Sequence, residues 1–201
     1  MTGVQTCALP ICTLISPRHL IYADHYQIPH GTELRFVAPN NTHVSRVLTN
    51  SMRIPGTDLH VGVLDANVPT NVIGFAKVLP ADFADSLAGI PALGLNQFEQ
   101  ALVVDIAGIR PDHWIQFAIP ADPARKQFYR DKISGDSGQP AFLILHGQLV
   151  ILTVWTGGGP GSGYFIPSYA NQINAAMQSL GGHHQLTTVD FTEVSRVSVP
   201  Q

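Results

Sequence analysis

The chain has 201 residues, of which 45% are hydrophobic and 12% charged, and it carries a formal net charge of −3. This length suits one large domain or two fused small ones, and its 15 prolines and 18 glycines favour short strands and turns over long helices. The small negative charge gives no reason to expect nucleic acid or an anionic membrane as a partner. No apolar run approaches the roughly 20 residues needed to cross a bilayer.

Residues 1–11 are not expected to belong to the folded domain. Residues 1–11 have no basic start and no long apolar stretch, so they are not a signal peptide. They resemble translated sequencing-adapter read-through, and we interpret them as a non-native leader that replaces the native N-terminus. The two cysteines, Cys7 and Cys12, lie too close together in sequence to join distant parts of a fold, and they are too few for a metal site.

The first half of the chain consists of short alternating runs of polar and apolar residues. Such period-2 alternation is typical of half-buried strands. Turns are predicted at Ser16-Pro17-Arg18, where proline fixes its φ angle, and at Pro39-Asn40-Asn41. The strands predicted from this pattern cover residues 13–15, 19–23, 32–37, 42–48, 59–64 and 72–78.

The second half continues with strands and ends with a helix. Residues 80–97 read as a loop with a turn of helix near residues 82–87, and the following strands are predicted at residues 101–109, 114–119, 141–145 and 149–155. Residues 157–163 form a glycine-rich loop that lacks the spacing of a dinucleotide-binding loop. A helix is predicted over residues 168–180, capped by Ser168 and ended by Gly181 and Gly182. Residues 186–199 are predicted to form an added strand or a tail.

A turn rich in Gly, Asp and Ser runs directly into an apolar strand at residues 132–143, which read Lys-Ile-Ser-Gly-Asp-Ser-Gly-Gln-Pro-Ala-Phe-Leu. Such a bend exposes the hydroxyl of Ser137 and aims successive backbone N–H groups at one point. Acyl transfer requires both a reachable nucleophile and donors placed where negative charge develops. Gly and Asp-Ser also favour ordinary β-turns, so this segment alone leaves the choice open.

Residues 135–140, Gly-Asp-Ser-Gly-Gln-Pro, resemble the Gly-Asp-Ser-Gly-Gly-Pro signature of the chymotrypsin-like (trypsin-fold) serine peptidases, with Gln139 replacing one glycine. That family orders its catalytic triad His, Asp, Ser along the chain. Residues 13–26 are similar to its segment ending in Thr-Ala-Ala-His-Cys, and residues 58–64 to its Asp-Ile-Ala-Leu-Leu-Lys-Leu. Residues 149–157 are similar to its Ser-Trp-Gly segment, so four motifs follow the family's order.

The resemblance implies an all-β fold of two six-stranded antiparallel β-barrels with a C-terminal helix. The N-terminal barrel would cover residues 12–79, a linker residues 80–97, the C-terminal barrel and helix residues 98–182, and a tail residues 183–201. The family normally has one more strand at its start, which we expect to be missing here.

The resemblance also implies a catalytic triad of His25, Asp58 and Ser137. Histidine, with an ordinary pKa of about 6.5, can take the serine proton and return it to the leaving group. Asp58 would accept the Nδ1–H of His25 and fix its tautomer. Asp65 is the alternative acid, whereas Asp24 would point to the opposite side of an extended segment.

The remaining site residues also follow from the resemblance. The oxyanion hole falls on the backbone N–H groups of Gly135 and Ser137. Asp136 would have a structural role. In many relatives this aspartate pairs with the N-terminal amine of an Ile-Val-Gly-Gly sequence, which does not occur in the present sequence.

The substrate-binding positions implied by the resemblance are Asp131, Val154, Trp155 and Thr156. Asp131 falls where an acid at the pocket floor selects Arg or Lys, whereas Thr156 replaces a glycine and would narrow the pocket in favour of small residues.

The leading functional hypothesis is a monomeric serine endopeptidase that acts on peptide or protein substrates without a cofactor or metal. His183 and His184 are expected to be solvated, since adjacent histidines do not readily share one tetrahedral ion. The alternatives are an esterase-type serine hydrolase and a catalytically impaired binding domain of the same fold. The low cysteine count fits a bacterial protein but does not decide its compartment. We expect the protein to be secreted or periplasmic, with a cytoplasmic location as the alternative.

Overall fold

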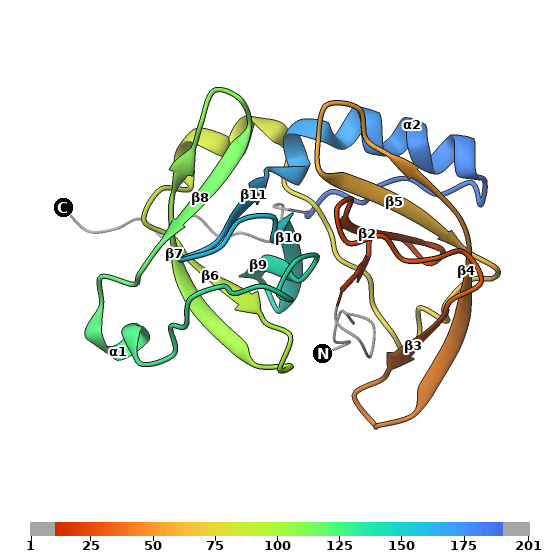
Figure 1. The fold of residues 1–201 in the computed structure, drawn as a ribbon, viewed down its shortest axis with the longest axis horizontal. Coiled ribbons are helices and arrows are strands. Elements are labelled where there is room, and N and C mark those ends of the chain that lie inside the picture. Colours follow the sequence, from red (N-terminus) through yellow and green to blue (C-terminus); the bar gives the residue numbers. More distant parts are fainter. Residues whose placement is uncertain (1–10, 191–201) are drawn as a thin grey trace.

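The computed structural model describes residues 11–190 (Figure 1). The expected leader, apart from Ile11, and the last part of the expected tail lie outside these residues. The fold is all-β, with two curled antiparallel sheets that occupy separate halves of the molecule and one longer helix at the C-terminal end.

The first sheet is built from the N-terminal third of the chain and has the strand order β1-β2-β5-β4-β3. Its strands match the predicted ones closely, except that the fourth runs five residues further than expected because it also pairs with β5. The strands are β1 (Thr13–Leu14), β2 (His19–Ala23), β3 (Glu33–Val37), β4 (His43–Arg53) and β5 (Leu59–Leu64).

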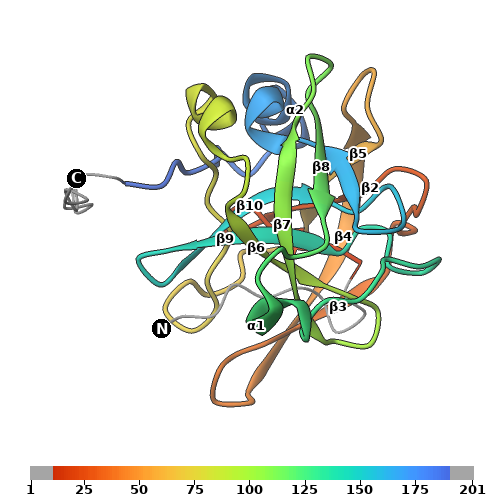
Figure 2. The same cartoon turned by 90° about the vertical axis from the view of Figure 1, so that its left-hand side faces the viewer.

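The second sheet has the order β10-β9-β6-β7-β8-β11. Figure 2 shows this sheet toward the viewer, with β7 and β8 forming a long hairpin. Its strands are β6 (Pro91–Leu95), β7 (Ala101–Ile109), β8 (Trp114–Ala118), β9 (Pro140–Leu145), β10 (Gln148–Val154) and β11 (Ser162–Tyr164). The helical elements are η1 (Ala81–Ser86), α1 (Pro123–Lys126), η2 (Ile166–Tyr169) and α2 (Ala170–Leu180).

Three apolar clusters hold the fold together, one inside each curled sheet and one between the sheets. Alternate residues of a strand face opposite sides, so a strand covered on both faces is apolar throughout. In β2, Leu20 and Tyr22 enter the cluster inside the first sheet, whereas Ile21 enters the cluster between the sheets. In β9, Phe142 likewise points between the sheets. The two sheets therefore share one apolar interface.

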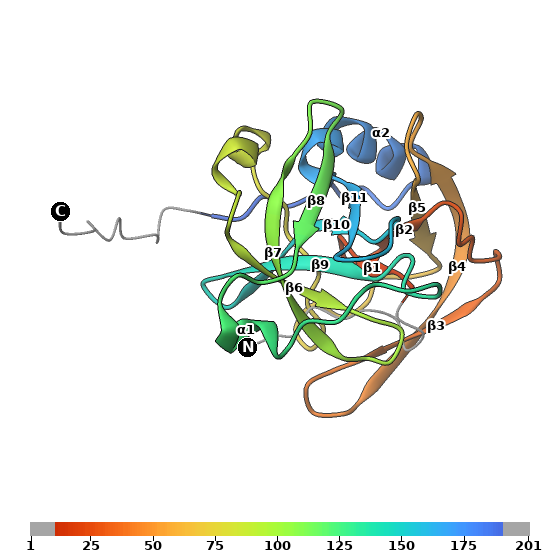
Figure 3. The ribbon, with the colours of Figure 1, turned by 60° about the vertical axis from the view of Figure 1, so that its left-hand side comes forward.

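Helix α2 closes the side of this interface next to the first sheet. It contacts β4 and β5, and Figure 3 shows it lying along the upper side of the molecule. Its buried residues are Ile173, Ala176 and Met177, all in the cluster between the sheets. A helix that follows the second sheet in sequence therefore packs against the first, which ties the two halves together.

Two predicted boundaries between the halves are wrong. Residues 72–78 are not a strand that closes the first sheet; Lys77 and Val78 make isolated bridges to Val150 and Thr188. The expected linker is also shorter, because Pro91–Leu95 forms β6 in the middle of the second sheet. Proline is tolerated at the first position of a strand.

Two of the glycines that suggested loops have packing reasons instead. A Cβ on Gly94 would lie 2.7 Å from Cζ2 of Trp155, so β6 needs a glycine where the indole crosses it. A Cβ on Gly163 of β11 would lie 2.4 Å from Oγ1 of Thr153. Close approach of a neighbour, and not turn formation, accounts for both positions.

The start of the C-terminal helix also differs from the prediction. Ser168 lies inside the 3₁₀ turn η2, and the residue before α2 is Tyr169, whose side chain makes no capping hydrogen bond. The predicted end is confirmed, since Gly181 follows the helix with a φ of 89°. Such positive φ values are adopted most readily by glycine.

Met177→Ala should lower the free energy of unfolding by about 2–5 kcal/mol, because Met177 is fully buried between α2 and the first sheet. The matched control is Met52→Ala, which shortens a side chain in β4 that is 40% exposed. Denaturant unfolding would measure both. Equal losses in the two variants would contradict the role given to α2.

Candidate active site

The pairing of β2 with β5 brings His25 and Asp58 together. Ala23 at the end of β2 is paired with Leu59 at the start of β5. Because the strands are antiparallel, the residues that follow β2 lie beside those that precede β5. One further backbone hydrogen bond, from the N–H of Asp24 to the carbonyl of Asp58 at 3.0 Å, extends this pairing beyond the strands.

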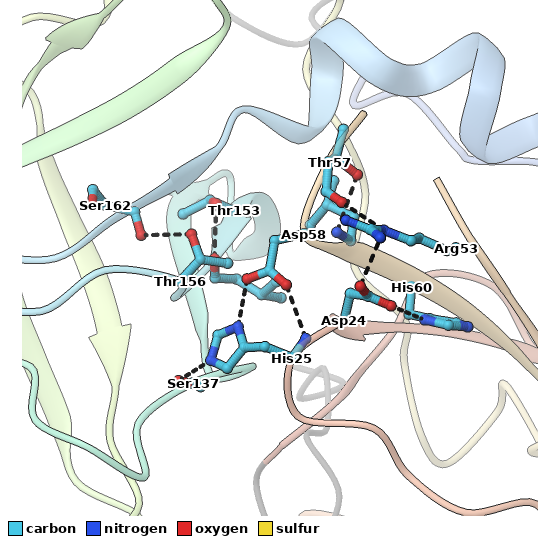
Figure 4. A network of polar contacts seen from close by, with 12 residues as sticks. Asp24, His25, Arg53, Thr57, Asp58, His60, Ser137, Thr153, Thr156 and Ser162 are labelled. Carbon is cyan, nitrogen blue, oxygen red and sulfur yellow. Dashed lines mark hydrogen bonds and ion pairs between the residues drawn. The ribbon is translucent and has the colours of Figure 1, made fainter. Parts of the chain in front are cut away.

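Asp58 holds His25 through two hydrogen bonds (Figure 4). Oδ1 of Asp58 accepts the backbone N–H of His25 at 2.9 Å, and Oδ2 lies 2.5 Å from Nδ1 of the ring. With Nδ1–H donating to the carboxylate, Nε2 is left as an acceptor. Nε2 lies 2.7 Å from Oγ of Ser137, which comes from the other sheet, just before β9. The three predicted residues form one continuous chain of hydrogen bonds.

The two competing carboxylates lie elsewhere. Asp24 contacts Nδ1 of His60 at 2.8 Å and Nε of Arg53 at 3.0 Å, on the side away from His25 (Figure 4). Oδ1 of Asp65 accepts the backbone N–H of Val47 at 2.9 Å, so this carboxylate belongs to the β4 edge. Of the acids considered from the sequence, only Asp58 contacts His25.

The loop before Ser137 is organised around the buried carboxylate of Asp136, which is 2% exposed. Its Oδ1 accepts the backbone N–H of Gln97 and its Oδ2 accepts that of Ile133, both at 2.9 Å. Nε2 of Gln97 also donates to the carbonyl of Ser134 at 3.0 Å. The carboxylate is thus held by backbone donors of this chain.

Gly135 adopts a φ of 100°, and a Cβ there would lie 2.5 Å from Oε1 of Gln97. Both the conformation and the close packing require glycine. Within residues 11–190, the N–H groups of Gly135 and Ser137 have no hydrogen-bond acceptor. The two donors predicted for an oxyanion hole are therefore available to a bound group.

Gln97 was missed by the sequence reasoning, which placed it in a linker. A glutamine in a polar loop carries no local signal, and its role depends on a contact with residues nearly forty positions away. Gln139, which departs from the family motif, is fully buried, and its side-chain amide has no partner in the described part of the chain. Its backbone carbonyl accepts the N–H of Trp155 at 2.8 Å.

A pocket of about 140 Å³ opens beside Ser137. Of the predicted substrate-binding residues, Trp155 and Thr156 line it, whereas Val154 is buried between the sheets. Asp131 is exposed, is not a lining residue, and accepts a hydrogen bond from the hydroxyl of Tyr129. Burial, together with this carboxylate, raises the pKa of Tyr129. The pocket is lined by residues 132–134, 136–137 and 155–158.

Lys132 contributes to the wall of this pocket and is only 3% exposed. Its removal from water lowers the pKa of the ammonium to about 8, and the nearby charges of Asp136 and Asp131 oppose this shift only in part. The sequence reasoning did not select Lys132, because lysine in a polar turn is ordinarily solvated.

The two adjacent histidines lie apart from the site. His184 is near Oδ1 of Asn67, at 3.4 Å from Nε2, and its ring stacks edge-on against His19. Burial lowers the pKa of His19. Among residues 11–190 there is no cluster of three or more metal-ligating side chains, and no helix there is long and apolar enough to cross a membrane.

No protein-family model matches the chain, and no curated protein matches it. The interpretation of the site therefore depends on its own residues and geometry.

Asp136→Asn should lower the free energy of unfolding by about 1.5–3 kcal/mol, because an amide cannot accept both buried N–H groups that the carboxylate holds. The control is Asp112→Asn, which weakens only an exposed ion pair with Arg110. Urea unfolding would compare the two. A stability loss confined to Asp112→Asn would show that the loop does not depend on Asp136.

Proposed function

We propose that the protein is a serine endopeptidase that hydrolyses peptide bonds through an acyl-enzyme intermediate. The observation that carries the proposal is the hydrogen-bonded chain from Asp58 through His25 to Ser137. Its side chains are accessible, since that of His25 is 47% exposed and that of Asp58 24%. A nucleophile, a base and an orienting acid in contact form the arrangement that activates a hydroxyl group.

The first half of the reaction acylates Ser137. Oγ attacks the carbonyl carbon of the substrate while its proton passes to Nε2 of His25. The carbonyl electron pair moves onto oxygen, where the N–H groups of Gly135 and Ser137 can donate to it. When the intermediate collapses, the C–N bond breaks and His25 returns the proton to the leaving amine.

The second half releases the acyl group. Water gives a proton to His25 and its oxygen adds to the ester carbon. Collapse then breaks the bond to Oγ, which takes the proton back from His25. Asp58 stays ionised throughout and stabilises the imidazolium formed in each half.

The order of residues along the chain favours a peptidase over an esterase. Esterases with a Gly-Asp-Ser nucleophile place the serine near the N-terminus, whereas here His25 comes first and Ser137 late. A binding domain that has lost catalysis is disfavoured because the contacts of the triad are complete. Labelling by a fluorophosphonate probe would separate the hydrolases from such a domain, and the ratio of peptide to ester turnover would separate the two hydrolases.

Ser137→Ala should abolish both fluorophosphonate labelling and peptide hydrolysis, because Oγ is the attacking atom. The free energy of unfolding should change by less than about 0.5 kcal/mol, since Ser137 is only partly buried at a turn. Ser179→Ala, on the exposed side of α2, is the matched control and should label normally. Mass spectrometry of the labelled protein would identify the modified residue. Labelling that persists in Ser137→Ala would place the nucleophile elsewhere.

Asp58→Asn should lower kcat about 10⁴-fold, because the amide favours the tautomer that leaves Nε2 protonated and unable to accept the serine proton. Asp65→Asn is the control, since Asp65 contacts Val47 and not the histidine. Steady-state kinetics on one peptide substrate would measure both. If the loss followed Asp65→Asn instead, the assignment of the acid would be incorrect.

A further inference from the structure

One of the residues that line the pocket beside Ser137 carries a buried cation. Lys132 lines the pocket and is 3% exposed. Its Nζ lies 5.0 Å from the centroid of the Trp155 ring, and Trp155 is itself a wall residue. Cε of Lys132 lies 3.6 Å from the position of a Cβ on Gly94, which is an ordinary contact distance, so the lysine stem packs beside β6. The ammonium group thus lies over the ring of one wall residue, and the stem that carries it packs against β6.

This ammonium has unused hydrogen-bonding capacity. It has three donors, and in the described part of the chain its one hydrogen bond is to the carbonyl of Arg130 at 3.2 Å. No carboxylate of residues 11–190 lies within ion-pair distance of Nζ, although a buried charge is ordinarily paired. The cation–π contact offsets only part of the lost hydration.

The acids near Lys132 do not supply the missing partner. Both oxygens of Asp136 accept backbone N–H groups, from Gln97 and Ile133. Asp131 is exposed outside the pocket and accepts from Tyr129. Both acids are thus held by other donors and neither lies within ion-pair distance of Nζ, whereas the ammonium can still donate.

We propose that this pocket binds the side-chain carboxylate of a glutamate or aspartate, with Lys132 as its counter-charge, so that the enzyme cleaves after acidic residues. The proposal rests on the proposed peptidase function, because it concerns the substrate residue just before the scissile bond. A small pocket narrowed by Thr156 suits a compact acidic side chain better than a long basic or large aromatic one. An incoming carboxylate would complete the ion pair that the chain leaves unmade.

The preference should weaken at alkaline pH. Without a bound substrate, the ammonium of Lys132 has a pKa of about 8. Burial lowers this pKa, and the charges of Asp136 and Asp131 oppose the shift. As pH rises through about 8, Lys132 loses its proton and its attraction for a carboxylate. The informative quantity is the ratio of kcat/KM for two substrates at each pH, because any pH dependence that both substrates share cancels in it.

The test uses four peptides that differ only at the residue before the scissile bond, which is Glu, Gln, Ala or Lys. At pH 7 we expect kcat/KM for the Glu peptide to exceed that for the Gln peptide about 10²-fold, because the Gln amide leaves the ammonium unpaired. Lys132→Met keeps an apolar stem over Trp155 and removes the charge, and should reduce the ratio to about threefold or less. Lys126→Met, on the exposed helix α1, removes the same charge outside the pocket and should leave the ratio unchanged.

Two results would overturn the inference while leaving the proposed function intact. One is cleavage of the Lys or Ala peptide in preference to the Glu peptide. The other is a Glu/Gln ratio that survives in Lys132→Met. Thermal unfolding of Lys132→Met should show a folded protein, since replacing an unpaired buried charge by an apolar side chain is commonly neutral or stabilising.

A binding measurement separates failure of the inference from failure of the proposed function. Calorimetry with Ser137→Ala would compare peptides that end in Glu and in Gln, without any turnover. Tighter binding of the Glu peptide, lost in the double variant with Lys132→Met, supports the inference even if no peptide is hydrolysed and no fluorophosphonate reacts. Equal binding of the two peptides overturns it, whether or not the protein is a peptidase.

Discussion

The site depends first on the register between β2 and β5. Pairing Ala23 with Leu59 sets the next residue of one strand beside the preceding residue of the other, and the hydrogen bond from Asp24 to the carbonyl of Asp58 fixes that placement. A shift of one residue would turn every side chain of β2 to the opposite face. Because both faces are close-packed, side chains of other sizes and shapes would then have to fill each apolar cluster, which opposes the shift. The burial of the strands therefore determines the contact between His25 and Asp58.

Ser137 reaches His25 from the other sheet, so the 2.7 Å contact between them also depends on how the sheets are packed. The cluster between the sheets supplies this constraint, because it joins Ile21 of β2 and Phe142 of β9 in one close-packed interior. Close-packed interiors resist small displacements. Helix α2 adds a second connection across the same interface. The geometry of the three residues is thus a property of the whole fold, although each of them lies in a loop.

Sequence reasoning succeeded where a motif is local and failed where a side chain is placed by a contact that no motif includes. The strands of the first sheet and the neighbourhood of His25, Asp58 and Ser137 follow from short patterns that each include their own signal. Strand β6 was missed because Pro91 and Gly94 suggest a loop, and only the indole of Trp155 explains the glycine. The placement of Asp131 was inferred by counting residues, but the direction of its side chain is set by Tyr129. The period of polar and apolar residues predicts strands and helices. It does not show which side chains contact each other, as Gly94 and Trp155 or Asp131 and Tyr129 do.

The loop before Ser137 carries two buried charges that the chain treats differently. The carboxylate of Asp136 has a backbone donor for each oxygen, so it stabilises one conformation of the loop. The ammonium of Lys132, four residues earlier, has one carbonyl acceptor and the face of an aromatic ring. A buried charge that lacks a partner costs stability, and such a cost is commonly found where a protein binds something. The satisfied charge orders the loop around Ser137, and the unsatisfied one is the basis of the anion preference proposed above for the adjoining pocket.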